Sequence, residues 1–445
     1  MNGPITGSTT REIVESVEEG VQAGTLQPGT GLPSVRSLAA QLSVSPATAA
    51  AAYRDLRLRG VVSARGGSGT TIAERPALAT PPPPAVAIDS ALRDLSQANP
   101  DPELLPDLGR ALRRISTEPV LYGTSPLDDD LVALAHDWCS DAVGRRSADD
   151  YGLCVTGGAL DAIERILRSR CRVGDEVGVE DPSYVGVLDL VRGMGLRPVG
   201  FAVDDNGPIA EDVAELLERG QVKTMIVTPR AQNPTGAAIT QERAKALRRV
   251  LRAHRDVHVI ENDYFSMLAG VPHHPLSTKR DSWTVIRSMS KLIGPDLRMA
   301  ILVGDPRTIA RVRGSQQLGT AWVSHLLQRL AVAIWRDPQT ADLFTRTQRT
   351  YDERRQRLIR ELAAAGIQAR GQTGFNVVVP VPEESAAVQG LAARGWQVRS
   401  GERHRTGTNP FIRITTATLS PADSAKLAAD LAEVLAPTTA LSASP

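Results

Sequence analysis

Hydrophobic residues recur every three or four positions in the first part of the chain, which is the spacing of one face of a helix. Such stripes occupy residues 13–21, 35–42 and 49–56. Two short apolar runs, VVSA and TIA, then flank the glycine-rich stretch RGGSGT, which is the pattern of a β-hairpin. The sequence therefore predicts three short helices followed by a hairpin.

The second and third helices have well-marked starts. Ser34 precedes the second helix and can cap it. Ser45 precedes the third, where Pro46 occupies the first helical position and loses no hydrogen bond. Because only a tight turn separates these helices, we expect a helix-turn-helix with the hairpin as its wing.

Beyond residue 90, short runs of β-branched residues alternate with helical stretches rich in alanine, leucine and arginine, which indicates an α/β architecture. Four successive prolines at 81–84 favour an extended segment between the two patterns. A chain of 445 residues is also too long for one ordinary core. We predict an N-terminal domain at 1–75, a proline-rich linker at 76–90, an α/β domain at 91–437 and a disordered tail at 438–445.

Charge changes this picture only locally. The whole chain has a net charge of +1, which by itself gives no argument for a nucleic-acid partner. Residues 31–75, however, hold arginines that outnumber their acidic neighbours Asp55 and Glu74, namely Arg36, Arg54, Arg57, Arg59, Arg65 and Arg75. One face of the first domain is therefore predicted to be basic, as contacts to DNA phosphates require.

The remaining composition bears on the compartment. Cys139, Cys154 and Cys171 lack metal-ligand spacing, so we expect ordinary thiols in a reducing cytoplasm and no bound metal. The N-terminal residues lack the pattern of a signal peptide, and no apolar run approaches the roughly 18 residues of a membrane span. We expect a cytoplasmic protein with no membrane partner.

The stretch from LQPGTGLPSVRSLAAQLSVSPATAAAAYRDL to RLRGVVSARGGSGT closely resembles the GntR family of winged-helix repressors. This resemblance implies that the first domain binds double-stranded operator DNA. It assigns the DNA contacts to the starts of the second and third helices and to the wing, at Ser34, Arg36, Ser45, Thr48, Arg65 and Gly67.

Two groups in the second domain suit an anionic or phenolic ligand. Gly157 and Gly158 follow a short apolar run and precede an amphipathic helix, so their backbone amides lie at a helix N-terminus, where anions bind. Asn233 stands in the turn NPTG at the end of another apolar run, and its amide is a neutral donor for a phenolate or hydroxyl.

A third group surrounds Lys291, which follows an apolar run and has Ser288, Ser290 and Arg298 nearby in sequence. An arginine beside a lysine at a strand end disfavours the ammonium form, and this favours an amine that forms a Schiff base. The hydroxyls and the guanidinium suit a phosphate monoester. Since ligands of open α/β sheets bind at the carboxyl ends of strands, these groups are predicted to share one site.

Taken in order, these pieces resemble the fold-type I aminotransferases of class I/II over residues 91 to 437. Their combination with a GntR-type head resembles the MocR subfamily of regulators. The resemblance implies a mostly parallel central sheet, a smaller C-terminal α+β subdomain, pyridoxal 5'-phosphate as cofactor, and a homodimer. It makes Lys291 the carrier of the internal aldimine, lets Asn233 contact the phenolic oxygen, and stacks Tyr184 on the ring. It gives the phosphate to Gly157, Gly158, Ala159, Ser288, Ser290 and Arg298, an effector carboxylate to Arg413, and a contact to the phosphate across the dimer interface to Tyr122.

The pyridine nitrogen has two candidate partners, Asn262 and Asp263, in the run VIENDYF. Neighbouring strand residues point to opposite sides, so only one of them can face the ring. If Asp263 faces it, the ring nitrogen stays protonated and the cofactor withdraws electrons. If Asn262 faces it, that counter-charge is missing.

The leading interpretation is a regulator that senses a small amino compound or a vitamin B6 vitamer at Lys291 and so changes its hold on DNA. The alternative is a working aminotransferase that carries a DNA-binding head. A third interpretation is a module that binds pyridoxal phosphate only to report its level.

Overall fold

The computed structural model describes residues 5–22, 24–58, 61–65, 69–72, 92–144 and 146–436. The chain forms two compact units, an N-terminal one and a larger C-terminal one. The predictions that fall outside the described residues are the linker at 76–90, the tail at 438–445, the DNA contact at Gly67 and two arginines of the predicted basic face, Arg59 and Arg75. None of the described helices combines the length and the apolar character that a membrane span requires.

The N-terminal unit has the predicted three helices and hairpin, with α1 at Thr10–Gln22, α2 at Val35–Leu42, α3 at Pro46–Leu58, β1 at Val62–Arg65 and β2 at Gly69–Ile72. The two strands pair antiparallel. The predicted stripes face one another, because their residues form a single buried cluster with one residue of each strand: Ile13, Val14, Val17, Leu26, Leu38, Ala39, Ala49, Ala52, Tyr53, Leu56, Val62 and Ile72. The hydroxyl of Tyr53 donates to the carbonyl of Pro33 at 2.7 Å, which ties α3 to the residue before the cap of α2.

The larger unit is built on an eight-stranded sheet with the order β4-β11-β10-β9-β8-β5-β6-β7. The strands span Gly152–Thr156 (β4), Glu176–Asp181 (β5), Arg197–Asp204 (β6), Gly207–Pro208 (β7), Val222–Val227 (β8), His258–Asp263 (β9), Trp283–Ser288 (β10) and Ala300–Gly304 (β11). The central strands β8, β9 and β10 run parallel, whereas β11 is antiparallel to both of its neighbours. This mixed, mostly parallel sheet confirms the predicted α/β class.

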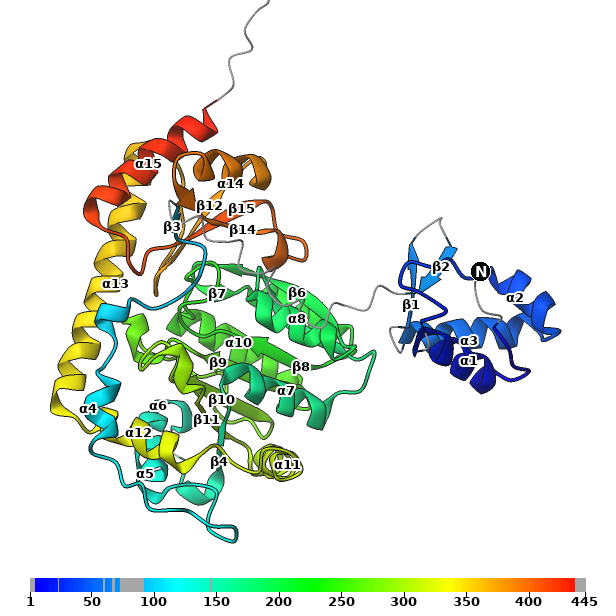
Figure 1. Cartoon of the computed structure of the whole chain (residues 1–445), viewed down its shortest axis with the longest axis horizontal. Coiled ribbons are helices and arrows are strands. Elements are labelled where there is room, and N and C mark those ends of the chain that lie inside the picture. Colours follow the sequence, from blue (N-terminus) through cyan, green and yellow to red (C-terminus); the bar gives the residue numbers. More distant parts are fainter. Residues whose placement is uncertain are drawn as a thin grey trace, which may run out of the picture. The chain divides into compact units, whose positions relative to one another are not determined.

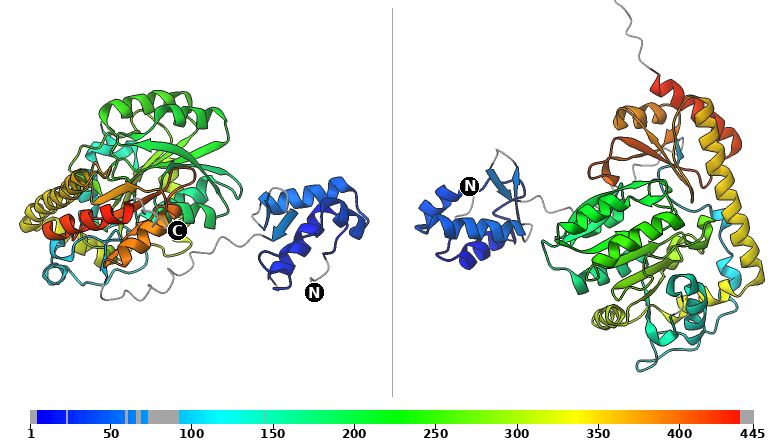
Figure 2. Two further views of the ribbon diagram at one scale, coloured as in Figure 1. Left: turned by 90° about the horizontal axis from the view of Figure 1, so that it is seen from above. Right: turned by 180° about the vertical axis from the view of Figure 1, so that it is seen from behind.

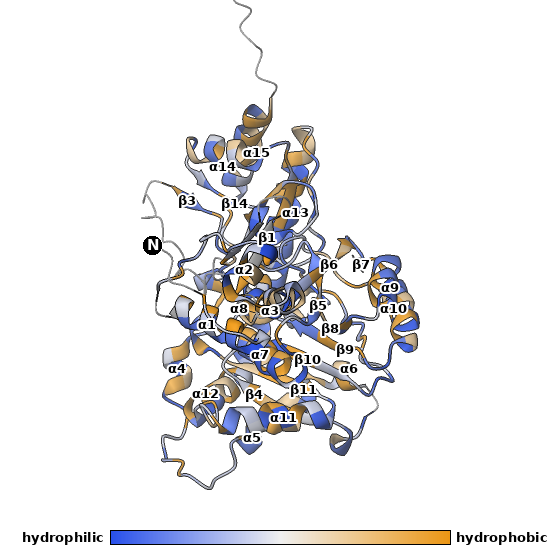
Figure 3. Cartoon of the chain, turned by 90° about the vertical axis from the view of Figure 1, so that its right-hand side faces the viewer, coloured by the Kyte–Doolittle hydropathy of each residue, from blue (hydrophilic) through white to orange (hydrophobic). Residues whose placement is uncertain are grey.

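Helices cover the sheet (Figure 1), and the right-hand view of Figure 2 shows the green helices α9 and α10 lying along one side of it. Every residue of β9, β10 and β11 is buried, as expected where helices cover both faces of a sheet. Figure 3 shows that the helices around the sheet carry both hydrophobic and hydrophilic positions. The helices of this layer span Leu108–Leu112 (α4), Asp129–Trp138 (α5), Ser140–Val143 (α6), Ala159–Arg170 (α7), Val185–Gly193 (α8), Ala210–Glu218 (α9), Gln241–Ala253 (α10), Pro306–Gln317 (α11) and His325–Trp335 (α12).

The C-terminal subdomain contains a three-stranded sheet with the order β12-β15-β14. The long helix α13 and the last helix α15 pack side by side against it (Figure 1). Its elements are α13 (Pro338–Ala364), β12 (Asn376–Pro380), α14 (Glu384–Ala392), β13 (Trp396–Gln397), β14 (Arg399–Ser400), β15 (Phe411–Thr415) and α15 (Pro421–Leu435). Short 3-10 helices span Pro102–Leu104, Ala148–Asp150, Ser266–Ala269, Pro295–Leu297 and Glu402–His404.

One strand of this subdomain comes from the other end of the unit. β3, at Arg93–Asp94, pairs parallel with β13, so the first described residues of the larger unit lie against Trp396 and Gln397. The guanidinium of Arg93 also forms an ion pair with Asp423 in α15 and donates to the carbonyl of Thr418 at 2.8 Å. The start of the unit is therefore part of its C-terminal subdomain.

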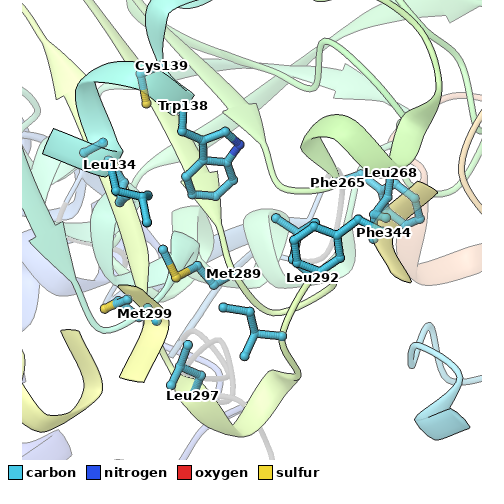
Figure 4. Close-up of a cluster of buried hydrophobic side chains, with 14 of the residues drawn as sticks. Leu134, Trp138, Cys139, Phe265, Leu268, Met289, Leu292, Leu297, Met299 and Phe344 are labelled. Atoms are coloured by element: carbon cyan, nitrogen blue, oxygen red, sulfur yellow. The ribbon is translucent and has the colours of Figure 1, made fainter. Parts of the chain in front are cut away.

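The largest hydrophobic cluster lies between the sheet and helices α5 and α12. Figure 4 shows Met289 close to Met299 and Leu297, and Phe265 close to Leu268 and Phe344. Met289, Leu292 and Ile293 are almost completely buried in this cluster. The loop after β10 is thus held on both sides of Lys291 by apolar side chains.

Candidate functional site

A pocket of about 280 Å³ lies at the carboxyl ends of β8, β9 and β10 and is closed by residues of the C-terminal subdomain. The structure brings most of the predicted site residues to this pocket, namely Gly158, Ala159, Tyr184, Asn233, Asn262, Ser288, Ser290, Lys291, Arg298 and Arg413. The strands that end here are adjacent in the sheet although they are distant in sequence. The general location of ligand sites in open α/β sheets accounts for this gathering.

Lys291 lies in the loop that follows β10, three residues after Ser288, and its side chain lines the pocket. The ammonium donates a hydrogen bond to the carbonyl of Ala98 at 2.5 Å and lies 5.7 Å from the ring centroid of Phe375. Burial, together with the nearby charge of Arg413, lowers the pKa of Lys291 to about 8. Near neutral pH a useful fraction of this amine is therefore unprotonated and nucleophilic.

The start of α7 and the loop after β10 form a cradle for an anion. Gly158 has a φ of +112°, and a side chain at this position would meet the guanidinium of Arg298, because its Cβ would lie only 3.0 Å from Nη2 of that arginine. On the other side, the hydroxyl of Ser288 donates to that of Ser290 at 3.0 Å. Two hydroxyls, a guanidinium and a helix N-terminus are the donors that a phosphate monoester accepts.

Gly157 does not belong to this cradle. Its backbone amide donates to the carboxylate of Asp161 at 2.8 Å, and the residue does not line the pocket. The expectation that the Gly157 amide faces the ligand is therefore wrong for this structure. The reason is local: an aspartate in the first turn of α7 accepts the hydrogen bond that the amide would otherwise offer.

Asn233 and Arg413 contact each other inside the pocket. Arg413 donates through Nη1 to the side-chain oxygen of Asn233 at 3.0 Å and through Nη2 to the carbonyl of Ser96. Burial and the neighbouring charge of Arg399 lower the pKa of Arg413 to about 10, so the guanidinium stays charged at neutral pH. The amide nitrogen of Asn233 is left as a donor for a ligand oxygen.

Asn262 and Asp263 lie on opposite faces of β9. Asn262 lines the pocket with only 6% of its surface exposed, and its side-chain oxygen has no hydrogen-bond partner among the described residues. Asp263 points away, toward Arg230 at 2.5 Å and Arg287 at 3.1 Å. Burial alone would raise the pKa of Asp263, but the two guanidinium charges outweigh it and hold the pKa well below its usual range.

The alternation of strand residues thus answers the question that the sequence left open. The placement of Asp263 in the cofactor site is wrong for this structure, because its carboxylate is fully buried in ion pairs on the other face of the sheet. A neutral amide, not a carboxylate, faces the ligand from this strand.

The two tyrosines differ. Tyr184 lines the pocket and is 39% exposed, so its ring is accessible to a ligand that stacks on it. Tyr122 is 91% exposed, lies outside the pocket and packs edge-on against Trp322 with ring centroids 5.6 Å apart. Its predicted contact needs a second subunit and stays a prediction.

Residues that the sequence did not single out complete the pocket wall: Gln97, Ala98, Asn99, Leu160, Val185, Thr228, Tyr264, Met299, Arg399 and His404. Among the described residues, only a few buried polar side-chain atoms lack a partner, and four of them belong to residues of this pocket: Asn262 Oδ1, Arg399 Nε, His404 Nε2 and Arg413 Nε. Because unpaired buried polar atoms are costly, this concentration indicates a site built for a polar ligand.

The predicted DNA contacts in the N-terminal unit occupy the two helix starts. Ser34 accepts from the backbone of Ser37 at 3.1 Å, and Ser45 accepts from the backbone of Thr48 at 3.1 Å, so both are caps. Ser34, Arg36 and Ser45 are at least partly exposed, and so is Thr48. Arg65 is the last residue of β1, and the structure does not describe its side chain.

Comparison with known proteins agrees with this architecture. Residues 93–431 match the family described as aminotransferase class I and II, and residues 9–72 match the bacterial regulatory proteins of the gntR family. The chain therefore belongs to the class I and II aminotransferase family and carries a GntR-type DNA-binding domain at its N-terminus. It is a DNA-binding transcriptional regulator of the MocR type, and its cofactor is pyridoxal phosphate.

Several relatives are transcriptional regulators by name, and two of these names refer to vitamin B6 or pyridoxine. The vitamin B6 salvage pathway transcriptional repressor PtsJ of Salmonella typhimurium is 38% identical over 439 residues, which cover 97% of this chain and 99% of the relative. The pyridoxine biosynthesis transcriptional regulator PdxR of Corynebacterium glutamicum is 28% identical over 320 residues, or 68% of each chain. Among solved structures, a kynurenine aminotransferase of Pyrococcus horikoshii has a TM-score of 0.70 at 20% identity over 78% of this chain and 91% of that one, which shows a shared fold.

Proposed function

We propose that this protein is a regulator whose hold on DNA changes when a vitamin B6 vitamer or a small amino compound binds around Lys291. The observation that carries the proposal is a buried amine with a lowered pKa, set in a pocket of donors, on a chain with a DNA-binding unit. The names of two relatives refer to vitamin B6 salvage and pyridoxine biosynthesis, which supports a vitamer as the effector.

The pocket residues fit pyridoxal phosphate group by group. Lys291 would hold the aldehyde, Asn233 the phenolic oxygen, and Tyr184 the face of the ring. Gly158, Ala159, Ser288, Ser290 and Arg298 would hold the phosphate. When bound, the cofactor supplies an aldehyde that condenses with amines and a ring that withdraws electrons from the attached atoms.

Asn262 favours sensing over turnover. After the assignments above, the ring nitrogen is the one polar group of the cofactor without a partner, and Asn262 is the residue of β9 that lines the pocket. Its amide can donate an N–H to an unprotonated ring nitrogen, or accept from a protonated one. A neutral amide cannot balance the charge of a protonated ring nitrogen as a carboxylate does. The electron-withdrawing state that transamination needs is therefore disfavoured.

A working aminotransferase is the second candidate, because the pocket keeps both the Lys291 amine and the buried guanidinium of Arg413. In either case a homodimer is proposed, in which Tyr122 reaches the partner's phosphate. Two paired DNA-binding units would then meet a two-fold symmetric operator.

The test uses the full-length protein purified with its cofactor. We expect a visible absorbance band, fixation of the cofactor to Lys291 by borohydride, and loss of that fixation in Lys291→Ala. Operator binding is measured in parallel with pyridoxal phosphate, pyridoxamine phosphate and amino acids. If none of these compounds changes the affinity for operator DNA, the proposed sensing function is refuted. Sustained production of keto acid from an amino acid supports the aminotransferase alternative.

A further inference from the structure

Two arginines lie directly opposite each other in the small sheet that closes the pocket. Arg399 of β14 and Arg413 of β15 are register partners in an antiparallel pair, and both side chains line the pocket. Paired residues of neighbouring strands share one face and lie close together, so like charges there repel. The charge of Arg399 indeed lowers the pKa of Arg413.

No carboxylate among the described residues forms an ion pair with either arginine. Arg413 donates to a side-chain amide and to a backbone carbonyl, both neutral. The charge of Asp94 raises the pKa of Arg413, but the Asp94 carboxylate accepts its hydrogen bonds from the backbone and hydroxyl of Ser96. The Nε atoms of Arg399 and Arg413 are both buried without a partner. The pair therefore places an excess of positive charge in the pocket wall.

His404 adds an acceptor beside this pair. Its Nδ1 lies 2.8 Å from the carbonyl oxygen of Ser183, which can only accept, so Nδ1 carries the proton. Burial and the charge of Arg413 lower the pKa of His404 to about 3, so the ring is neutral and Nε2 is an acceptor. Nε2 is buried without a partner in the same pocket.

We propose that Arg399 selects an effector with a second negative charge. One anionic group of the effector binds Arg413, the additional charge binds Arg399, and an N–H or O–H of the effector donates to His404. The cofactor does not satisfy this pair, because its single phosphate has its own cradle at the start of α7. The inference rests on the proposed function, since it names the class of compound that the same pocket detects.

The second negative charge of the effector can belong to a carboxylate or to a phosphate. Pairs of matched ligands distinguish these two sources. Aspartate with asparagine, and glutamate with glutamine, differ by one negative charge at nearly constant shape. Phosphoserine with serine tests the phosphate, because both members keep the carboxylate that binds Arg413. Binding to the cofactor-loaded protein is measured by calorimetry, and operator affinity is measured with each ligand.

In the wild type we expect the more acidic member of at least one pair to bind about 10- to 100-fold more tightly, as a buried charged hydrogen bond implies. Arg399→Gln should abolish this preference without weakening the neutral member, whereas Arg413→Gln should weaken both. Arg399→Lys should keep part of the preference, because it keeps the charge. His404→Phe should weaken the preferred ligand about tenfold by removing the acceptor.

Arg394→Gln is the matched control, since Arg394 is a surface arginine of the same subdomain that pairs with the exposed Glu433. It should behave as the wild type. Two results would overturn the inference: equal binding of both members of every pair, or a preference that survives Arg399→Gln. If operator binding still responds to a ligand in those cases, the proposed function stands and only the role of Arg399 fails.

Discussion

Two single substitutions, one on each face of β9, test which residue sets the protonation of the cofactor's ring nitrogen. Asn262→Asp puts a carboxylate into the pocket, where Asn262 is 6% exposed and has an unpaired oxygen. An opposite charge in contact raises a base's pKa by about 1 to 3 units, or about 1.4 to 4 kcal/mol. Since burial also raises the pKa of the new carboxyl, we expect a rise near the lower end for the ring nitrogen of the bound cofactor.

The readout is the ring nitrogen itself. A cofactor labelled with ¹⁵N in the ring reports protonation through its chemical shift as the pH is varied, and Asn262→Asp should move this titration to higher pH. Keto acid formation from a bound amino acid should rise about tenfold or more, as expected for one unit of pKa. DNA binding provides a third measurement that does not depend on turnover.

Asp263→Asn is the matched control on the opposite face. It leaves Arg230 and Arg287 without their shared carboxylate, so the free energy of unfolding should fall by about 3 to 5 kcal/mol, measured by denaturant titration. The ring nitrogen of folded, cofactor-loaded protein should titrate as in the wild type. If Asp263→Asn shifts that titration and Asn262→Asp does not, our assignment of the two faces is wrong.

Three further predictions concern the lysine and the DNA-binding unit. With its pKa lowered to about 8, Lys291 should react with free pyridoxal phosphate faster as the pH rises toward 8, which stopped-flow absorbance measures. The stability of the apoprotein should also rise from pH 8 upward, because the unfolded chain still binds the proton that the folded chain has lost. Thermal denaturation across this pH range measures that rise. Ser45→Ala removes the cap at the start of α3 and should cost about 1 kcal/mol in the thermal unfolding of the N-terminal unit, with Ser45→Asp restoring most of it. Arg36→Gln should weaken operator binding and reduce the salt dependence of the DNA affinity by about one charge, whereas Arg394→Gln should change neither, and an unchanged slope would remove Arg36 from the interface.

Local features of this protein could be predicted from sequence, since they depend on neighbours in the chain. The stripes of α2 and α3, the caps at Ser34 and Ser45, and the strand ends that carry Asn233 and Lys291 all follow from short patterns. The failures have equally local causes. The backbone amide of Gly157 donates to Asp161, four residues later, instead of facing the pocket. Whether Asn262 or Asp263 faces the pocket depends on which side of β9 the pocket lies, and the sequence does not show this.

Arg399 and His404 could not be predicted in this way. Their places in the pocket depend on the pairing of β14 with β15 and on the contact of the 401–410 loop with Ser183, more than 200 residues earlier. The pairing of β3 with β13 is equally remote in sequence. No periodicity within either segment encodes such partners, because the partners are chosen by the packing of the whole subdomain.

The position of β3 brings the start of the larger unit to the wall of its pocket. Gln97, Ala98 and Asn99 form part of the pocket wall, and the lysine amine and the Arg413 guanidinium hold the backbone carbonyls of Ala98 and Ser96. When a ligand replaces Ala98 as the partner of Lys291, the backbone carbonyl that loses its hydrogen bond therefore lies a few residues after β3, at the N-terminal end of the larger unit.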